Sequence, residues 1–133
     1  MKSYMTEQEN ERQKSKRLSW YYSQLHKISD YYPTVASIII NYHQIYKSAF
    51  GTKEKENVLN YVATSRDAFL IECLNKECTS IGFNVEHIIS DMVTHKETNK
   101  KGKLDCEGSE APDHLYQSCG SSLWYNITIE YNK

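Results

Sequence analysis

Glycine, proline and long apolar runs are scarce in this sequence, and each shortage excludes a class of protein. The chain of 133 residues has five glycines and two prolines. The glycines are isolated, so the sequence has no glycine-rich loop of the kind that cradles phosphate. No apolar run approaches the roughly 18 residues of a membrane-spanning helix, and we therefore expect no membrane contact. The H-E-x-x-H pattern of zinc proteases is also absent.

The N-terminal segment lacks the apolar stretch of a secretory signal. Residues 1–20 read MKSYMTEQENERQKSKRLSW and are charged where such a signal is apolar. We therefore expect a cytoplasmic protein. In that compartment cysteines serve as metal ligands or as buried side chains more often than as disulfides.

The net charge of −1 conceals an uneven distribution along the chain. Residues 1–67 carry 10 basic and 7 acidic side chains, whereas residues 68–133 carry 6 basic and 10 acidic ones. A nearly neutral chain is not typical of intrinsic disorder, and it is also not typical of a dedicated nucleic-acid-binding protein. The division near Asp67 predicts two surfaces of different charge.

The first part of the chain, residues 1–67, is predicted to be a helical region of about three helices. Apolar residues at helical spacing follow a capping pattern that begins at Thr6, and Pro33 ends this first helix at Asp30 or Tyr31. A second helix is predicted over residues 34–50, with Gly51 at its C-terminal end. A third helix is predicted over residues 52–66.

The second part, residues 68–133, is predicted to be a four-cysteine α+β region. The apolar run 69–73 indicates a short buried strand, and Asn84 is a candidate cap for one helix. Residues 100–106 and 123–131 are expected to be strands, the second with strict alternation of apolar and polar residues. The predicted fold class is thus α+β, with a helical N-terminal half packed on a small antiparallel sheet with one helix.

The four cysteines are the clearest candidates for a site. Cys73, Cys78, Cys106 and Cys119 have the spacing C-x4-C-x27-C-x12-C, and each lies near the end of a predicted strand. A hairpin can bring the last two together, and a closed set of four thiolates is what a structural zinc site requires. We predict Zn²⁺ as a structural cofactor that staples the sheet. Independent buried cysteines, disulfides, or replacement of one cysteine by His114 remain alternatives.

A resemblance supports a metal site. The run Cys73-Leu-Asn-Lys-Glu-Cys78-Thr-Ser-Ile-Gly-Phe-Asn, then Cys106-Glu-Gly and Cys119 before a tyrosine-bearing strand, resembles the C-terminal, zinc-ribbon-like motif of small uncharacterised bacterial proteins. The resemblance covers residues 73–131. The chain has Leu74 where those proteins often have proline, and Ser80-Ile81 where they have further glycines. The resemblance implies a cytoplasmic metal site and no particular activity.

We expect no catalysis, because no nucleophile, base and orienting group share a recognisable spacing. The working hypothesis is a small non-catalytic protein that acts by macromolecular contact with a protein partner, as would a bacterial or phage inhibitor of a nucleic-acid-handling enzyme. The alternative is a zinc protein that binds nucleic acid directly through its basic and aromatic first helix and the 96–103 segment. The candidate contact residues are Arg12, Lys16, Arg17, Trp20, Lys100, Lys101, Lys103 and Trp124.

Overall fold

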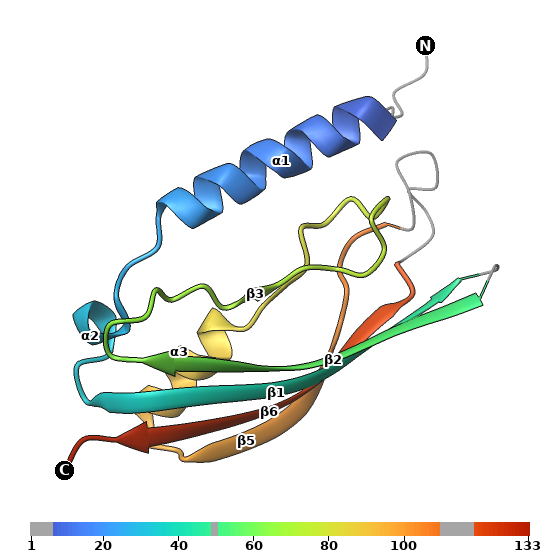
Figure 1. Ribbon diagram of the computed structural model, residues 1–133. Coiled ribbons are helices and arrows are strands. Elements are labelled where there is room, and N and C mark those ends of the chain that lie inside the picture. Colours follow the sequence, from blue (N-terminus) through green and yellow to red (C-terminus); the bar gives the residue numbers. More distant parts are fainter. Residues whose placement is uncertain (1–6, 49–50, 110–118) are drawn as a thin grey trace.

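The computed structural model describes residues 7–48, 51–109 and 119–133 and contains three helices and six strands in these ranges (Figure 1). The elements follow in the order α1 (Glu7–Ser23), α2 (Ile28–Tyr31), β1 (Val35–Ser48), β2 (Gly51–Val62), β3 (Leu70–Ile71), β4 (Phe83–Asn84), α3 (Glu86–Thr94), β5 (Asn99–Asp105) and β6 (Ser121–Tyr131). None of the described helices is long and apolar enough to cross a membrane.

A four-stranded antiparallel sheet in the order β2-β1-β6-β5 organises the chain. β1 and β2 form a long hairpin in which Ile40 lies opposite Leu59, and β6 pairs with the other edge of β1, with Ile40 opposite Ile127. β3 and β4 form a separate two-stranded ribbon. Both parts of the chain therefore contribute strands to one sheet, and the α+β fold class is confirmed.

The two helices predicted over residues 34–50 and 52–66 are wrong, because these residues form β1 and β2. The spacing Val35, Ile38 and Tyr42 fits a helix, but burial in the structure follows a period of two. Ile38, Ile40 and Tyr42 are buried, and the residues between them are less buried. Isoleucine, valine and tyrosine favour strands, where their side chains pack on a pleated surface. Residues 1–67 are consequently not a helical region.

The first helix is also shorter than predicted, because α1 ends at Ser23 and the single turn α2 follows separately. The backbone N–H of His26 donates to Oδ1 of Asp67 at 2.8 Å, and Lys27 forms an isolated bridge with Arg66. These contacts tie the segment between the helices to the segment that follows β2. The tertiary contacts therefore interrupt the helical pattern before Pro33.

The predictions for the second part of the chain are largely confirmed. α3 buries Ile88, Ile89 and Met92. Its N-cap is Val85 and not the predicted Asn84, which lies one residue earlier and accepts the N–H of Glu86 with Oδ1 at 3.0 Å. β5 and β6 are paired as a hairpin, and Leu123, Ile127 and Ile129 of β6 are buried. The predicted strand at 69–73 is present as the two-residue β3.

One face of the sheet carries the core. α3, the β3–β4 ribbon and α1 lie on the same side of the sheet, with the 63–85 segment between α1 and the strands (Figure 1). Ile38 and Ile40 of β1, Ile127 of β6, and Ile89 and Met92 of α3 belong to one buried cluster. In the described part of the chain no element packs on the opposite face, which we call the open face.

Substitution of two neighbouring isoleucines of β1 tests which face of the sheet is buried. Ile40 is fully buried, whereas Ile39 points to the open face and is half-buried. Ile40→Ala should lower the free energy of unfolding by about 2–5 kcal/mol, because it leaves a cavity in the core. The matched substitution Ile39→Ala should cost clearly less. Denaturant unfolding of both variants measures the difference, and equal losses would contradict a strand at these positions.

Candidate metal centre

The four cysteines come together at one end of the sheet. Their sulfur atoms all lie within 4.8 Å of one another, and the thiols are free. Sγ of Cys73 lies 3.5 Å from Sγ of Cys119, and Sγ of Cys78 lies 3.5 Å from Sγ of Cys106. The alternative of four independent core cysteines is therefore wrong. His114 lies outside the described residues.

The β5–β6 hairpin positions Cys106 and Cys119. Cys106 follows the last residue of β5, and its N–H donates to the carbonyl of Ser121 at 3.0 Å. The N–H of Cys119 donates to the carbonyl of Gly108 at 2.9 Å. A Cβ at Gly108 would collide with Sγ of Cys78, so the tight approach of this loop requires glycine. The expectation that a hairpin unites these two cysteines is confirmed.

The loop after β3 positions Cys73 and Cys78, and a buried glutamine holds it against the sheet. The Gln44 side chain is fully buried on the core face of β1. Its Nε2 donates to the carbonyl of Glu72 at 3.0 Å, and its Oε1 accepts the N–H of Leu74 at 2.8 Å. Gln44 therefore fixes the backbone on both sides of Cys73. Gln44 cannot be recognised from the sequence, because its partners lie 28 and 30 positions away.

Hydrogen bonds to the sulfur atoms favour thiolates. The N–H of Ser80 donates to Sγ of Cys78 at 3.3 Å, and Nδ2 of Asn75 donates to Sγ of Cys119 at 3.8 Å. Both of these groups donate to sulfur, whereas the Cys73 thiol itself donates to Oγ of Ser121 at 3.1 Å. Donors to sulfur orient metal-bound thiolates and stabilise their charge.

The pKa values of the four thiols are shifted in different directions by their mutual hydrogen bonds. Hydrogen bonds from Cys106, then from Cys73 and Cys78, lower the pKa of Cys119. A hydrogen bond from Cys106 also contributes most to lowering the pKa of Cys73, to about 7. The pKa of Cys106 is raised, chiefly by its interaction with Cys119. The pKa of Cys78 is raised as well, so Cys119 and Cys73 favour the thiolate while Cys106 and Cys78 keep their protons. Binding of a metal cation to all four would release those protons.

The sulfur geometry fits one tetrahedral ion. A metal–sulfur bond of about 2.3 Å places tetrahedral thiolates about 3.8 Å apart, close to the two measured separations of 3.5 Å. Cys78, Cys106 and Cys119 are buried and Cys73 is half-buried. The four cysteines can thus hold a metal ion in a site with little access to solvent.

Helix α1 is attached to the same loop. Nδ2 of Asn10, a buried residue, lies 3.2 Å from the carbonyl of Glu77 and 3.4 Å from that of Cys78. Lys14 donates to the carbonyl of Lys76 at 3.0 Å, and Arg17 to that of Thr79 at 3.1 Å. Part of the basic face of α1 therefore contacts the cysteine loop, while Arg12, Lys16 and Trp20 are exposed.

The remaining predicted contact residues are divided between two places. Lys100 lies 3.5 Å from a carboxylate oxygen of Asp91 in α3. Lys101 and Lys103 of β5 share the open face with Trp124, whose ring centroid lies 5.2 Å from Nζ of Lys103. The open face and α1 lie on opposite sides of the sheet (Figure 1). The structure therefore does not unite the predicted contact residues in one surface.

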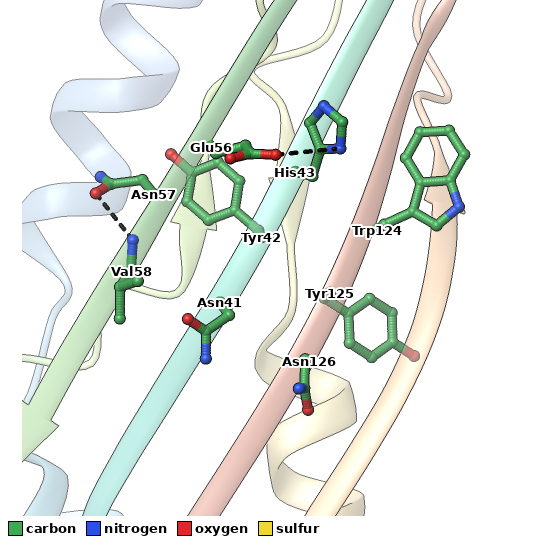
Figure 2. Close-up of a pocket in the computed structure, with 9 residues that line it drawn as sticks. All are labelled: Asn41, Tyr42, His43, Glu56, Asn57, Val58, Trp124, Tyr125 and Asn126. Carbon is green, nitrogen blue, oxygen red and sulfur yellow. Dashed lines mark hydrogen bonds and ion pairs between the residues drawn. The ribbon is translucent and has the colours of Figure 1, made fainter.

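A shallow hollow of about 530 Å³ occupies the middle of the open face. Figure 2 shows His43 of β1 beside Trp124 of β6, with Asn41 and Asn126 next along the same two strands. The ring centroids of His43 and Trp124 are 6.2 Å apart. Glu56 of β2 lies 3.8 Å from His43 at the edge of the hollow. Trp124, one of the predicted contact residues, is exposed here.

Comparisons with known proteins found no match: no family model, no curated protein and no solved structure is significantly similar to this chain.

Because Gln44 fixes the loop around Cys73, we expect its hydrogen bonds to increase the affinity of the cysteines for a metal ion. Gln44→Met keeps the volume but removes both hydrogen bonds, so metal affinity should fall about 10–100-fold. Tyr131→Phe is a matched control, because it removes hydrogen bonds to the carbonyls of Met92 and Glu97, outside the cysteine cluster. Competition with a chromophoric chelator measures the affinity of both variants. An unchanged affinity in Gln44→Met would contradict the role given to Gln44.

Proposed function

We propose that the four cysteines bind one structural Zn²⁺. The close approach of the four sulfur atoms carries this proposal. A tetrahedral set of four thiolates is typical of zinc or of iron, and zinc needs no redox partner. Four protein ligands leave no open position for water, so the ion would stabilise the fold and take no part in catalysis. Its binding free energy would contribute directly to folding.

Mass spectrometry tests the identity and number of the ions. The native protein should be heavier than the denatured protein by the mass of one zinc ion, and Cys78→Ser should lose this excess. Cys78 is the fully buried member of the set, so its replacement removes a ligand that water cannot easily replace. Ser109→Ala, close to the same loop, serves as the control. An excess that fits iron, or no excess, would contradict the zinc proposal.

We further propose that the chain is a non-catalytic binding protein and that its open face contacts a protein partner. Trp124 and Val58 are 42% and 48% exposed, and they lie with His43 around one hollow. Exposed aromatic and aliphatic groups that surround a hollow are typical of the centre of a protein interface. The narrower role of an inhibitor of a nucleic-acid-handling enzyme stays a prediction from the sequence.

The charges at the rim favour a protein over a nucleic acid. Lys101 and Lys103 border the hollow on the β5 side, whereas Glu54 and Glu56 border it on the β2 side. A polyanion would be attracted by the lysines and repelled by the glutamates, while a protein surface can complement both signs. The nucleic-acid alternative is weakened further because Arg17 of the first helix contacts the carbonyl of Thr79.

Paired variants of similar exposure test this surface. Trp124→Ala should abolish capture of a partner that the wild-type protein retains, because it removes the central aromatic anchor. Tyr22→Ala is the control, since Tyr22 on α1 is 44% exposed and lies away from the open face. Quantitative affinity capture with all three proteins measures the difference.

Two outcomes would contradict a protein partner on the open face. One is equal loss of the partner with both variants. The other is binding of a single-stranded oligonucleotide that falls steeply as the salt concentration rises and is lost in Lys101→Glu. Sedimentation of the purified wild-type protein as a dimer that Trp124→Ala dissociates would instead place a second copy on this face.

A further inference from the structure

A second hollow lies on the side of the sheet that carries the helices, away from the cysteines and from the open face. It has a volume of about 530 Å³ and lies between the end of α1, α2 and the start of α3. Aromatic rings and two carboxylates dominate its lining, namely Trp20, Tyr21, Tyr31, Tyr32, Asp67 and Glu86. We call it the aromatic cleft. Neither the proposed zinc site nor the proposed protein surface uses these residues.

The rings of the cleft are held in place from behind. The hydroxyl of Tyr21 accepts the N–H of Phe69 at 3.0 Å, and Tyr32 is buried beside Phe69, with ring centroids 6.5 Å apart. Tyr31 packs edge-on against the imidazole of His26, with centroids 4.6 Å apart. Trp20 is 67% exposed at the rim. The cleft therefore has an aromatic wall of Tyr21 and Tyr32 that is held in place, and two exposed aromatic residues, Trp20 and Tyr31, that a ligand could cover.

Asp67 is the unusual residue of this cleft, because it is a carboxylate with only 7% of its surface exposed. Oδ1 accepts the backbone N–H of His26 at 2.8 Å. Across residues 7–48, 51–109 and 119–133, no lysine, arginine or histidine side chain forms an ion pair with Asp67 or Glu86. The imidazole of His26 also lines the cleft, but it packs against Tyr31 and forms no ion pair with either carboxylate. A buried carboxylate normally has a partner of opposite sign, and a bound cation could supply it.

The carboxylates of Asp67 and Glu86 both affect the tyrosine hydroxyl groups of the cleft. Burial is the main cause that raises the pKa of Tyr21 to about 12, and the charges of Glu86 and Asp67 add to it. Burial also raises the pKa of Tyr32, with further contributions from the same two carboxylates. Both negative charges thus lie close to both hydroxyl groups. The lining of the cleft therefore combines two carboxylates with aromatic rings.

We propose that the aromatic cleft binds a compact organic cation, an alkylammonium or guanidinium group. Aromatic faces attract such cations, and quaternary ammonium groups are recognised in this way. The carboxylates of Asp67 and Glu86 neutralise the charge, and the rings replace the weakly held water around the alkyl groups. An inorganic metal ion fits less well, because in the described residues the four cysteines are the only group of three or more metal-ligating side chains that lie close together.

A cation and its neutral isostere test the proposal. The probes are choline and 3,3-dimethylbutan-1-ol, which have nearly the same shape but differ in charge. Each is titrated into the ¹⁵N-labelled, metal-loaded chain, and the shifts of the Trp20 indole N–H and of the Asp67 and Glu86 amides are followed. Choline should bind at least about tenfold more tightly than the alcohol.

Carboxylate variants locate the effect. Glu86→Gln and Asp67→Asn should each weaken choline binding about tenfold, because each removes one negative charge from the cleft. The amide oxygen introduced by Asp67→Asn can still accept the N–H of His26, and Glu86 is exposed, so both replacements leave the core intact. Asp105→Asn removes an exposed charge at the end of β5, outside the cleft, and should leave choline binding unchanged.

The remaining arms identify the source of the cation and the results that would overturn the proposal. Tighter binding of a glycine-flanked trimethyl-lysine peptide than of choline would assign the cleft to a side chain of a protein, and the reverse order to a free metabolite. Equal binding of choline and the alcohol, choline binding that survives both carboxylate variants, or displacement of choline by Mg²⁺ would overturn it. These outcomes leave partner capture through Trp124 unaffected.

Discussion

The approach of four sulfur atoms from separate segments is the constraint on which the rest of the structure depends. Cys73 and Cys78 lie in the loop after β3, whereas Cys106 and Cys119 lie where β5 and β6 meet their connecting loop. Few apolar residues lie in this loop, so the hydrophobic effect alone does not hold it on the sheet. The sulfur cluster and Gln44 connect the loop to the strands, and the loop in turn holds α1 through Asn10, Lys14 and Arg17.

The sheet separates two surfaces with different chemistry. The open face presents an exposed tryptophan, a histidine and a rim of both charge signs, which suits a protein partner. The aromatic cleft on the other side presents tyrosines and two carboxylates, which suits a cation. One sheet can carry both surfaces, because its core face is packed against the elements that form the cleft and its other face is left open. The uneven charge that the sequence shows near Asp67 does not correspond to either surface, since both parts of the chain contribute strands to the same sheet.

The sequence predicts the second part of the fold well and the first part poorly, for physical reasons. In β6 the alternation is clear, because one face is buried and the other is polar apart from Trp124. In β1 the open face carries Ile39 and Ile45 as well, so apolar residues occur on both faces and the period of two is obscured. In β2 the residues Lys53 to Glu56 favour a helix by intrinsic propensity, and only pairing with β1 makes them a strand.

The candidate sites also contain residues that the sequence identifies and residues that it does not. The cysteines could be identified by type and position, because four thiols near strand ends have few other uses. Gln44 and Asp67 could not, because a polar residue in an apolar pattern is indistinguishable from a surface residue until its distant partners are known. Of the contact residues predicted on α1, Arg17 donates to a backbone carbonyl of the cysteine loop, as does the neighbouring Lys14.

Amide hydrogen exchange before and after removal of the metal tests most directly the claim that the cysteine cluster holds the loop and α1 on the sheet. The account predicts that a strong chelator removes one ion per chain and that α1 and residues 72–80 lose protection before the amides of β1 and β6 do. Unchanged protection of α1 and of the loop in the metal-free protein, with the cysteines reduced, would contradict it.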